Sequence, residues 1–449
     1  MKEFVLNDFF DIDKCDQCGI CLNKCPVLLY PIEKAKIEIK KLINLEKAEV
    51  ILKCHSCFSC NLYCDKNCNP YNLILFNFYT RYVEKGISPI AKLVLPNEKY
   101  NLWTGLEFLF SKNENEIINN WDKEFTKQFL LMGCFTQFFP YLTESNIIKD
   151  IKKRGTEKLW CNGGHIYQLG LLDIVDQIGN MTINEFKRKK VEKIITFMEA
   201  EYSMIKNILP RFGHKIDIEL ETLSQYLLKE IKNNDLKLTK RLKSKVTIHD
   251  NCFSKSLGSE SWDTNRQILN ELGLKIIEME HNKENATCCG FGAASYSFNV
   301  LDIMKQSYIR LKEAESTGAK ALIVYCSACL FIFSVAKELL NIKLPIFHIF
   351  ELVQFATGET PKHNQSKRSW DIISIFTVQM LLNLFSKNFK IKTIDSNKTW
   401  SFSSILKFKI LKLLNKLFHF RMVRIFYSKL FKILLKLYNN TDIPLVLLF

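Results

Sequence analysis

No uninterrupted apolar run in the 449 residues reaches the roughly 18 residues that a membrane-spanning helix needs, so we expect no transmembrane segment. The first ten residues carry Glu3 and Asp8 and lack an apolar core of signal-peptide length, so we expect the chain to stay in the reducing cytoplasm. A glycine-rich dinucleotide loop between a strand and a helix is also missing, so we expect no bound flavin or nicotinamide.

Acidic residues are scarce near the C-terminus, and this shortage accounts for most of the basic charge. Of the formal net charge of +16, residues 361–449 contribute +13, with sixteen Lys and Arg against three Asp. A nucleic-acid surface is not indicated, because the basic residues alternate with aliphatic ones that gain little from phosphate contacts. We therefore expect no nucleic-acid partner.

Cysteine is abundant, with sixteen residues in tight clusters. Disulfide scaffolds belong to short secreted chains that cannot build a core otherwise, and this chain is about three times the usual domain length. Thiolate–metal chemistry is the better interpretation of the cysteines. The length also predicts two or three domains.

Three sections differ in composition, and they predict a multidomain α+β protein. Residues 1–124 hold nine cysteines among helix-like apolar repeats. Residues 125–358 alternate helical stretches with strand-like runs at 129–132, 194–197, 246–249 and 322–325. In the section 359–449, a polar linker at 359–369 precedes helical segments at about 370–385 and 404–438.

An internal repeat is visible in the middle section and predicts two similar lobes. The segments around Gly133-Cys134, 161–164 and 194–197 correspond to those around Cys252, 288–290 and 323–325.

Two cysteine runs near the N-terminus have the spacing C-x2-C-x2-C-x3-C of bacterial iron-sulfur proteins, in which the fourth cysteine ligates the other cluster. The runs therefore predict two 4Fe-4S clusters with exchanged fourth ligands. The first set is Cys15, Cys18, Cys21 and Cys64, and the second is Cys54, Cys57, Cys60 and Cys25. Zinc is the alternative, although zinc needs no third cysteine at the same interval in both runs.

The second run departs from the usual pattern in two places. Asp65 replaces the proline that normally follows the fourth cysteine, and Cys68 adds a ninth thiol. Cys68 competes with Cys64 as a ligand, but the spacing favours Cys64 and makes Cys68 a bystander.

The long helical spacer between the runs resembles the α-helical ferredoxin domain of succinate dehydrogenase and heterodisulfide reductase iron-sulfur subunits. The resemblance implies that helices rather than a ferredoxin-like sheet surround the clusters.

A second constellation follows in 252–329, with intervals of 35 residues between its parts. It consists of Cys252, Cys288, Cys289, Gly290, Cys326 and Cys329. The pattern resembles the cysteine-rich CCG domain of the heterodisulfide reductase-related family. That family includes the D-type subunits of heterodisulfide reductase, the C-type subunit of anaerobic glycerol-3-phosphate dehydrogenase, and the iron-sulfur subunits of lactate and glycolate oxidases. With the two runs, the resemblance covers about residues 11–358.

The resemblance implies a further 4Fe-4S cluster, of a noncubane kind, held by Cys252, Cys288, Cys289, Cys326 and Cys329, with Cys288 and Cys289 as the redox site. Adjacent cysteines point in different directions, so both reach one cluster only where a flexible residue such as Gly290 lets the chain turn. The alternative is that these cysteines are small buried hydrophobic residues.

The first lobe lacks most of this set, since Asn162, Met198 and Glu201 stand where cysteines are expected. Cys134 and Cys161 remain, and two thiols with His165 are few for a cluster. We expect this lobe to serve as a scaffold or docking surface.

His249 and Asp250 precede Cys252, and the sequence leaves two roles open for them: a hydrogen bond to a ligand or substrate, or a structural role at the end of a strand.

The basic tail has no Asp or Glu from 396 to 441, where Lys and Arg alternate with Leu, Ile and Phe. This pattern predicts two amphipathic helices that lie peripherally on an anionic membrane surface at the inner face of the cell membrane. The alternative is a helix pair packed on its own protein with a solvated basic face.

The resemblance implies an iron-sulfur electron-transfer subunit of an anaerobic respiratory-type oxidoreductase. Its partners would be a flavin or other dehydrogenase subunit and a membrane quinone or a thiol acceptor. The rival hypothesis is a disulfide reductase that acts at Cys288 and Cys289, and a third is a zinc-stabilised assembly platform.

Overall fold

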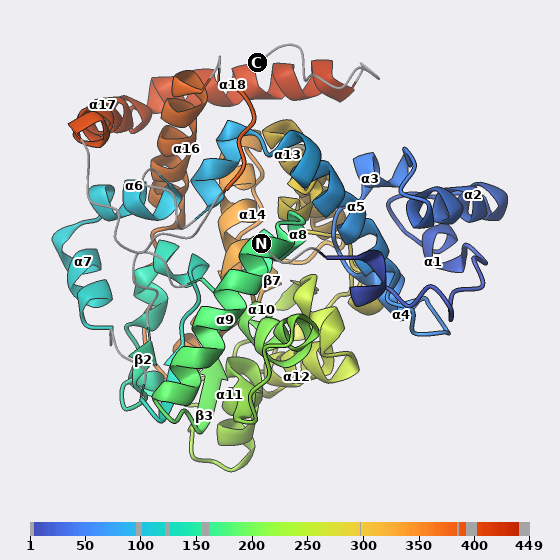
Figure 1. Cartoon of the computed structure of the whole chain (residues 1–449). Coiled ribbons are helices and arrows are strands. Elements are labelled where there is room, and N and C mark those ends of the chain that lie inside the picture. Colours follow the sequence, from blue (N-terminus) through green and yellow to red (C-terminus); the bar gives the residue numbers. More distant parts are fainter. Residues whose placement is uncertain are drawn as a thin grey trace.

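Two small parallel sheets lie among helices in the computed structural model, which describes residues 4–95, 101–121, 126–154, 161–296, 298–383, 386–391 and 402–439 (Figure 1). The fold is therefore of mixed helix and sheet. One extensive core of buried apolar side chains runs from Phe4 to Leu435, and a smaller core lies against the first sheet.

The two sheets have the same strand order, β2-β1-β3-β4 in the first and β6-β5-β7-β8 in the second. All pairings in both are parallel. The strands are β1 (Gln128–Leu131), β2 (Lys153–Arg154), β3 (Lys193–Thr196), β4 (Glu219–Thr222), β5 (Lys245–His249), β6 (Lys275–Ile276), β7 (Leu322–Val324) and β8 (Ile346–His348). The strands expected at 129–132, 194–197, 246–249 and 322–325 are thus β1, β3, β5 and β7.

The central strands are apolar throughout because parallel sheets are covered on both faces. Leu322, Ile323 and Val324 of β7 are all fully buried. The covering helices are α8 (Gly164–Gln168), α9 (Leu172–Arg188), α10 (Glu199–Ser203), α11 (Leu223–Lys232), α12 (Ser259–Glu271), α13 (Val300–Ser316), α14 (Ser327–Leu340) and α15 (Ile349–Ala356).

The N-terminal section is helical, and its described residues up to Trp121 contain no strand of a sheet. Its helices are α1 (Ile20–Asn23), α2 (Ile32–Ile43), α3 (Val50–Lys53), α4 (Ser59–Leu62), α5 (Pro70–Lys85), α6 (Leu102–Leu109) and α7 (Lys112–Asn119). The last two pack away from the cysteine runs, since α6 contacts α16 and α7 contacts the segment Pro140–Thr143.

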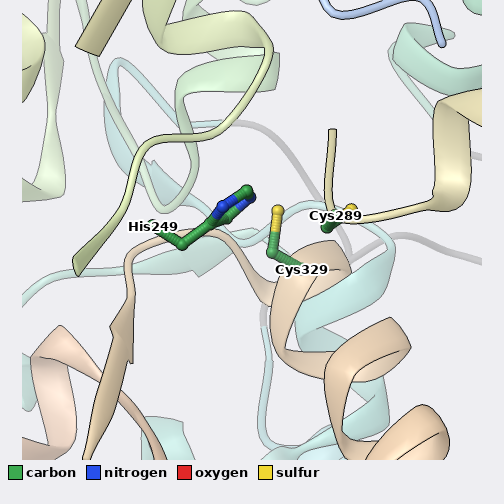
Figure 2. Close-up of side chains that lie close together, drawn as sticks. All are labelled: His249, Cys289 and Cys329. Carbon is green, nitrogen blue, oxygen red and sulfur yellow. The ribbon is translucent and has the colours of Figure 1, made fainter. Parts of the chain in front are cut away.

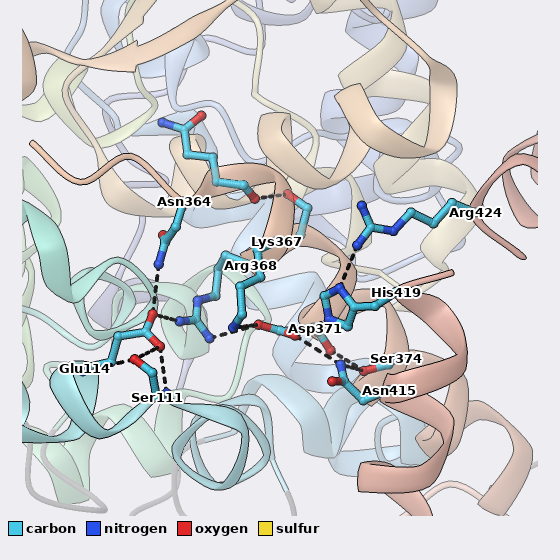
Figure 3. Close-up of polar contacts among 12 residues, drawn as sticks. Ser111, Glu114, Asn364, Lys367, Arg368, Asp371, Ser374, Asn415, His419 and Arg424 are labelled. Atoms are coloured by element: carbon cyan, nitrogen blue, oxygen red, sulfur yellow. Dashed lines mark hydrogen bonds and ion pairs between the residues drawn. The ribbon is translucent and has the colours of Figure 1, made fainter. Parts of the chain in front are cut away.

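Three helices complete the chain: α16 (Gln365–Leu382), α17 (Phe402–Phe418) and α18 (Arg421–Asn439). The expectation of a linker at 359–369 is wrong for its second half, where α16 begins. The reason is a set of buried polar contacts (Figure 3). The fully buried Arg368 pairs with Glu114 of α7 and with Asp371, and Asp371 accepts hydrogen bonds from Asn415 of α17 and from His419, just after that helix.

Among the helices that the structure describes, none has both the length and the hydropathy needed to cross a membrane.

Candidate functional site

The two N-terminal cysteine runs fold in the same way. In each run, the residues two and four positions after the first cysteine have positive φ: Gln17 (57°) and Gly19 (77°), then Ser56 (48°) and Phe58 (66°). A short helix follows each loop, α1 after the first and α4 after the second. Equal cysteine spacing therefore produces two equal thiol-bearing loops.

The first predicted ligand set surrounds a cavity of about 90 Å³. Cys15, Cys18 and Cys21 line it from the first run, and Cys64 from the second. Burial, followed by the charges of the neighbouring thiols, raises the pKa of Cys21. The structure thus brings these four thiols together, as the exchange of fourth ligands predicts.

Cys68 lines the same cavity. Burial and a hydrogen bond with Cys64 raise the pKa of Cys68 to about 12. The ninth thiol is therefore a direct neighbour of Cys64, and a bystander role for Cys68 stays a prediction.

The second predicted set gathers deeper in the protein. Burial and the charge of Cys57 raise the pKa of Cys25 to about 11, and burial raises the pKa of Cys60, with added effects of Cys21, Cys54, Cys57 and Cys25. Cys60 thus lies within electrostatic range of both sets, which places the two N-terminal sites next to each other.

The paired-cysteine set converges at the carboxyl ends of β5 and β7. One ring nitrogen of His249 and the Sγ atoms of Cys289 and Cys329 lie within 4.8 Å of one another (Figure 2). Cys289 is hydrogen-bonded to Cys288 and Cys329, and Cys329 to Cys326. Burial, with the charges of Cys289 and Cys326, raises the pKa of Cys252. All five predicted thiols therefore meet at one place.

The backbone after the cysteine pair turns sharply at Gly290, whose φ is 119°. A Cβ there would lie 2.3 Å from Oγ of Ser307, so only glycine fits. The N–H groups of Gly290 and Gly292 then point back at Sγ of Cys288, at 3.4 and 3.2 Å. Such N–H donors stabilise a thiolate.

His249 faces this site, which decides between the two roles left open for it. Nε of Arg310 donates to Nδ1 of His249 at 3.1 Å, so the ring proton belongs on Nε2. The imidazole is thereby set up to donate toward the thiols of Cys289 and Cys329. Hydrogen bonds with Cys288, Cys329 and His249 lower the pKa of Cys289 below its ordinary value.

Asp250 has the structural role instead. Its carboxylate accepts two hydrogen bonds from Arg266 at 2.9 and 2.8 Å, one from the hydroxyl of Tyr325 at 2.9 Å and one from the N–H of Lys283 at 2.7 Å. Burial alone would raise the pKa of Asp250, but these donors hold it below its ordinary value. The carboxylate thus joins the loops after β5, β6 and β7.

Gln168 of α8, in the first lobe, connects the second run to the paired-cysteine set. Its side-chain amide donates to the backbone oxygen of Ser56 at 3.0 Å and to Sγ of Cys252 at 3.3 Å. Ser56 also bonds Oγ of Ser295 at 2.8 Å. Two predicted cluster sites are therefore joined by hydrogen bonds through one buried side chain.

Lys255 forms a second connection between the same two sites. Its buried Nζ donates to the backbone oxygens of Cys57 at 2.9 Å and Ala286 at 2.5 Å. A positive charge so placed favours negative charge on the thiols around it.

The eroded positions of the first lobe also converge. Sγ of Cys134 and Sγ of Cys161 are 3.9 Å apart. A Cβ on Gly133 would lie 2.3 Å from Glu201 and 2.6 Å from Met198, so these two side chains fill the space beside the thiols. Trp103 of α6 donates to the backbone oxygen of Cys134 at 2.7 Å. This lobe places two thiols where the second places five.

The residues fit the iron-sulfur groups that the spacing implies. Soft thiolates are the ligands that such clusters use, and each of the three sites offers four or more. The thiols are mostly buried, which raises the pKa of Cys25, Cys54 and Cys252, and bound iron would supply the positive charge that makes them thiolates.

Gln168, Lys255 and Arg310 carry no sequence signal for their contacts with the site. Each is a polar residue in an ordinary helical or loop context, and its partner lies 61 or more residues away. Only the fold reveals that they support the thiol sites.

Comparison with known proteins gives a match of residues 246–334 to the cysteine-rich CCG domain family. A relative over nearly its whole length is the D-type subunit of dihydromethanophenazine:CoB–CoM heterodisulfide reductase of Methanosarcina mazei. Over 405 residues the two chains are 23% identical, and the match covers 80% of this chain and 97% of that one.

Two further relatives are longer than this chain. The probable iron-sulfur-binding oxidoreductase FadF of Bacillus subtilis is 23% identical over 71% of this chain and 42% of its own length. The EtfAB:quinone oxidoreductase of Syntrophomonas wolfei is 24% identical over 69% of this chain and 40% of its own length.

Proposed function

We propose that this chain, which is a CCG-domain oxidoreductase subunit related to heterodisulfide reductase, relays electrons from a dehydrogenase partner subunit to a membrane quinone. The observation that supports the relay most strongly is the continuity of the three thiol sites. Cys60 lies between the first two sets, and Gln168 joins the second set to Cys252.

In this proposal, Cys15, Cys18, Cys21 and Cys64 hold one 4Fe-4S cluster, and Cys54, Cys57, Cys60 and Cys25 hold another. Cys252, Cys288, Cys289, Cys326 and Cys329 hold a third of noncubane type. Such clusters supply one-electron transfer at potentials that hydrogen bonds to sulfur and solvent access set. The chain contributes those hydrogen bonds through Gln168, Gly292 and His249.

The first lobe favours relay over disulfide reduction with two clusters. It has two thiols, Cys134 and Cys161, and its remaining positions are filled by Asn162, Met198 and Glu201. In the proposal this lobe is a scaffold, and its contribution to electron flow is the amide of Gln168. Disulfide reduction at Cys288 and Cys289 alone is the rival function, and the relative from Methanosarcina mazei is named for heterodisulfide reduction.

Acceptor and membrane are proposed on the relatives and on the tail. One relative is named for a quinone. The tail helix α18 places Lys429, Lys432 and Lys436 on the surface beside exposed apolar residues. This combination favours binding to anionic lipid. We propose a peripheral position on the inner face of the cell membrane.

Anaerobic purification with iron and sulfide counting and paramagnetic resonance tests the cofactor assignment. We expect about twelve irons per chain, and about eight after Cys289→Ser with loss of one signal. Eight irons without any change on substitution would contradict the third cluster. Colourless protein without acid-labile sulfide would support zinc and contradict every redox proposal.

A second assay separates relay from disulfide reduction. The chain, reduced anaerobically with a viologen dye, is given either a soluble dye acceptor or a mixed disulfide. Reduction of the dye acceptor without thiol release supports the relay, and thiol release that Cys289→Ser abolishes supports the rival function.

A further inference from the structure

A cavity of about 550 Å³ lies between α13, α14, α16 and α18, apart from the cavity of the N-terminal thiols. Sites for small organic molecules usually measure about 300–1,000 Å³ and are mainly apolar with a few polar groups. This lining is of that kind: Ile303 and Met304 come from α13, Ile332 and Val335 from α14, Phe376 from α16 and Phe431 from α18.

One wall of this cavity adjoins the paired-cysteine site. Phe291 lines the cavity and is the second residue after Cys289. Its ring stacks on His165 with centroids 3.7 Å apart, and the next residue, Gly292, donates to Sγ of Cys288. A molecule in contact with Phe291 would therefore lie beside the thiols that the proposed function makes the last site of the relay.

A polar group is available in the same lining. Arg81 of α5 contacts the cavity and donates from Nη1 to the backbone oxygen of Tyr296 at 2.6 Å. Its Nε is buried and finds no hydrogen-bond partner in the described part of the chain. A buried donor without a partner costs about 1–3 kcal/mol, so a ligand oxygen accepting from it would be stabilised.

The rim of the cavity belongs to the amphipathic helix α18, which lies across the ends of α13, α14 and α16 (Figure 1). Leu430 lines the cavity and is also 42% exposed. The same helix carries further exposed apolar side chains, namely Met422, Phe426, Ile433 and Leu437. A solvated helix does not need such a stripe, whereas one that lies in a membrane interface does.

We propose that this cavity is the binding site for the membrane quinone, with the quinone ring beside Phe291 and its isoprenoid tail leaving past α18. The proposal rests on the proposed function for the identity of the ligand. The cavity provides apolar walls for the ring and tail, Arg81 provides a donor for a ring oxygen, and the exposed stripe of α18 provides access from the bilayer.

The test uses the full-length, anaerobically purified protein and decylubiquinone as the probe in equilibrium dialysis. Val335→Trp should fill the cavity and weaken binding by about tenfold or more. Met181→Trp, on a partly exposed position of α9 remote from the cavity lining, is the matched control and should bind like the parent. Both variants should keep the parental iron content.

Photolabelling of the unsubstituted protein with an azidoquinone keeps the proposal testable if Val335→Trp does not fold. We expect the label on peptides of α13, α14, α16 or α18. Label elsewhere, unchanged dialysis binding in a folded Val335→Trp, or equal affinity for stearate would overturn the quinone site.

The two proposals fail separately. If the protein passes electrons from reduced viologen to a soluble dye but does not bind decylubiquinone, the relay stands and the cavity assignment is wrong. If decylubiquinone binds in the cavity but no electrons reach any acceptor, the assignment of the cavity stands and the relay is wrong.

Discussion

The side-chain amide nitrogen of Gln168 lies 3.3 Å from Sγ of Cys252, although 84 residues separate them. The same nitrogen is 3.0 Å from the backbone oxygen of Ser56. One buried amide of the eroded first lobe therefore joins the second cysteine run to the paired-cysteine site.

Gln168→Leu removes the donor to Cys252 and keeps the side-chain volume similar. Because hydrogen bonds to sulfur raise the potential of an iron-sulfur site, we expect the potential of the third signal to fall by roughly tens of millivolts. Potentiometric titration followed by paramagnetic resonance measures this. Gln267→Leu, at an exposed position of α12, should leave the potential unchanged. Equal potentials in both variants would show that Gln168 only fills space.

Cys134→Ser and Cys161→Ser test the scaffold role of the first lobe. The two thiols are 3.9 Å apart and have Glu201 and Met198 beside them rather than two further cysteines. We expect either variant to keep the parental iron and sulfide content, in contrast to Cys289→Ser. A loss of about four irons per chain would mean that this lobe holds a cluster as well.

Cys68→Ser distinguishes the two thiols that lie together at the end of the second run. The spacing assigns Cys64 to the cluster, so we expect Cys68→Ser to retain its iron and Cys64→Ser to lose about four irons. Iron and sulfide assays on both variants decide the matter. The opposite ranking would make Cys68 the ligand, and both thiols line the cavity that it would need to reach.

Arg266→Met leaves the fully buried Asp250 without its two hydrogen bonds from a charged donor. Breaking a buried ion pair from one side costs about 3–5 kcal/mol, so the urea midpoint of the anaerobic protein should fall markedly. Lys312→Met breaks an exposed pair with Glu315 and should cost less than about 1 kcal/mol. Similar midpoints for the two variants would show that Asp250 does not join the three loops.

Replacing Lys429, Lys432 and Lys436 together by Gln tests the membrane surface. Each lysine near anionic lipid contributes about 1 kcal/mol, so the triple variant should bind anionic vesicles about a hundredfold more weakly. Cosedimentation at several salt concentrations measures the loss. A second triple variant, Lys187, Lys190 and Lys243 to Gln, removes the same charge from an exposed region outside the tail and should bind like the parent. Equal loss in both would indicate non-specific attraction.

Much of the organisation could be read from local patterns. The four apolar runs become β1, β3, β5 and β7, and the expected tail helices are present as α16, α17 and α18. The cysteine intervals also predict which thiols meet, because equal spacing produces equal loops with positive φ at matching positions. Strands β2, β4, β6 and β8 escaped prediction, since two of them have only two residues and β4 is largely polar.

Sequence by itself determined the thiol sets, because a cluster ligand is specified by residue type and short spacing, which are local properties. Only the tertiary structure decided what surrounds them. Gln168 reaches Cys252 across 84 residues, Arg368 pairs with Glu114 across 254, and the cavity beside Phe291 closes only when α18 packs on α14. Contacts of this range depend on how the elements pack, and no short stretch of sequence encodes them.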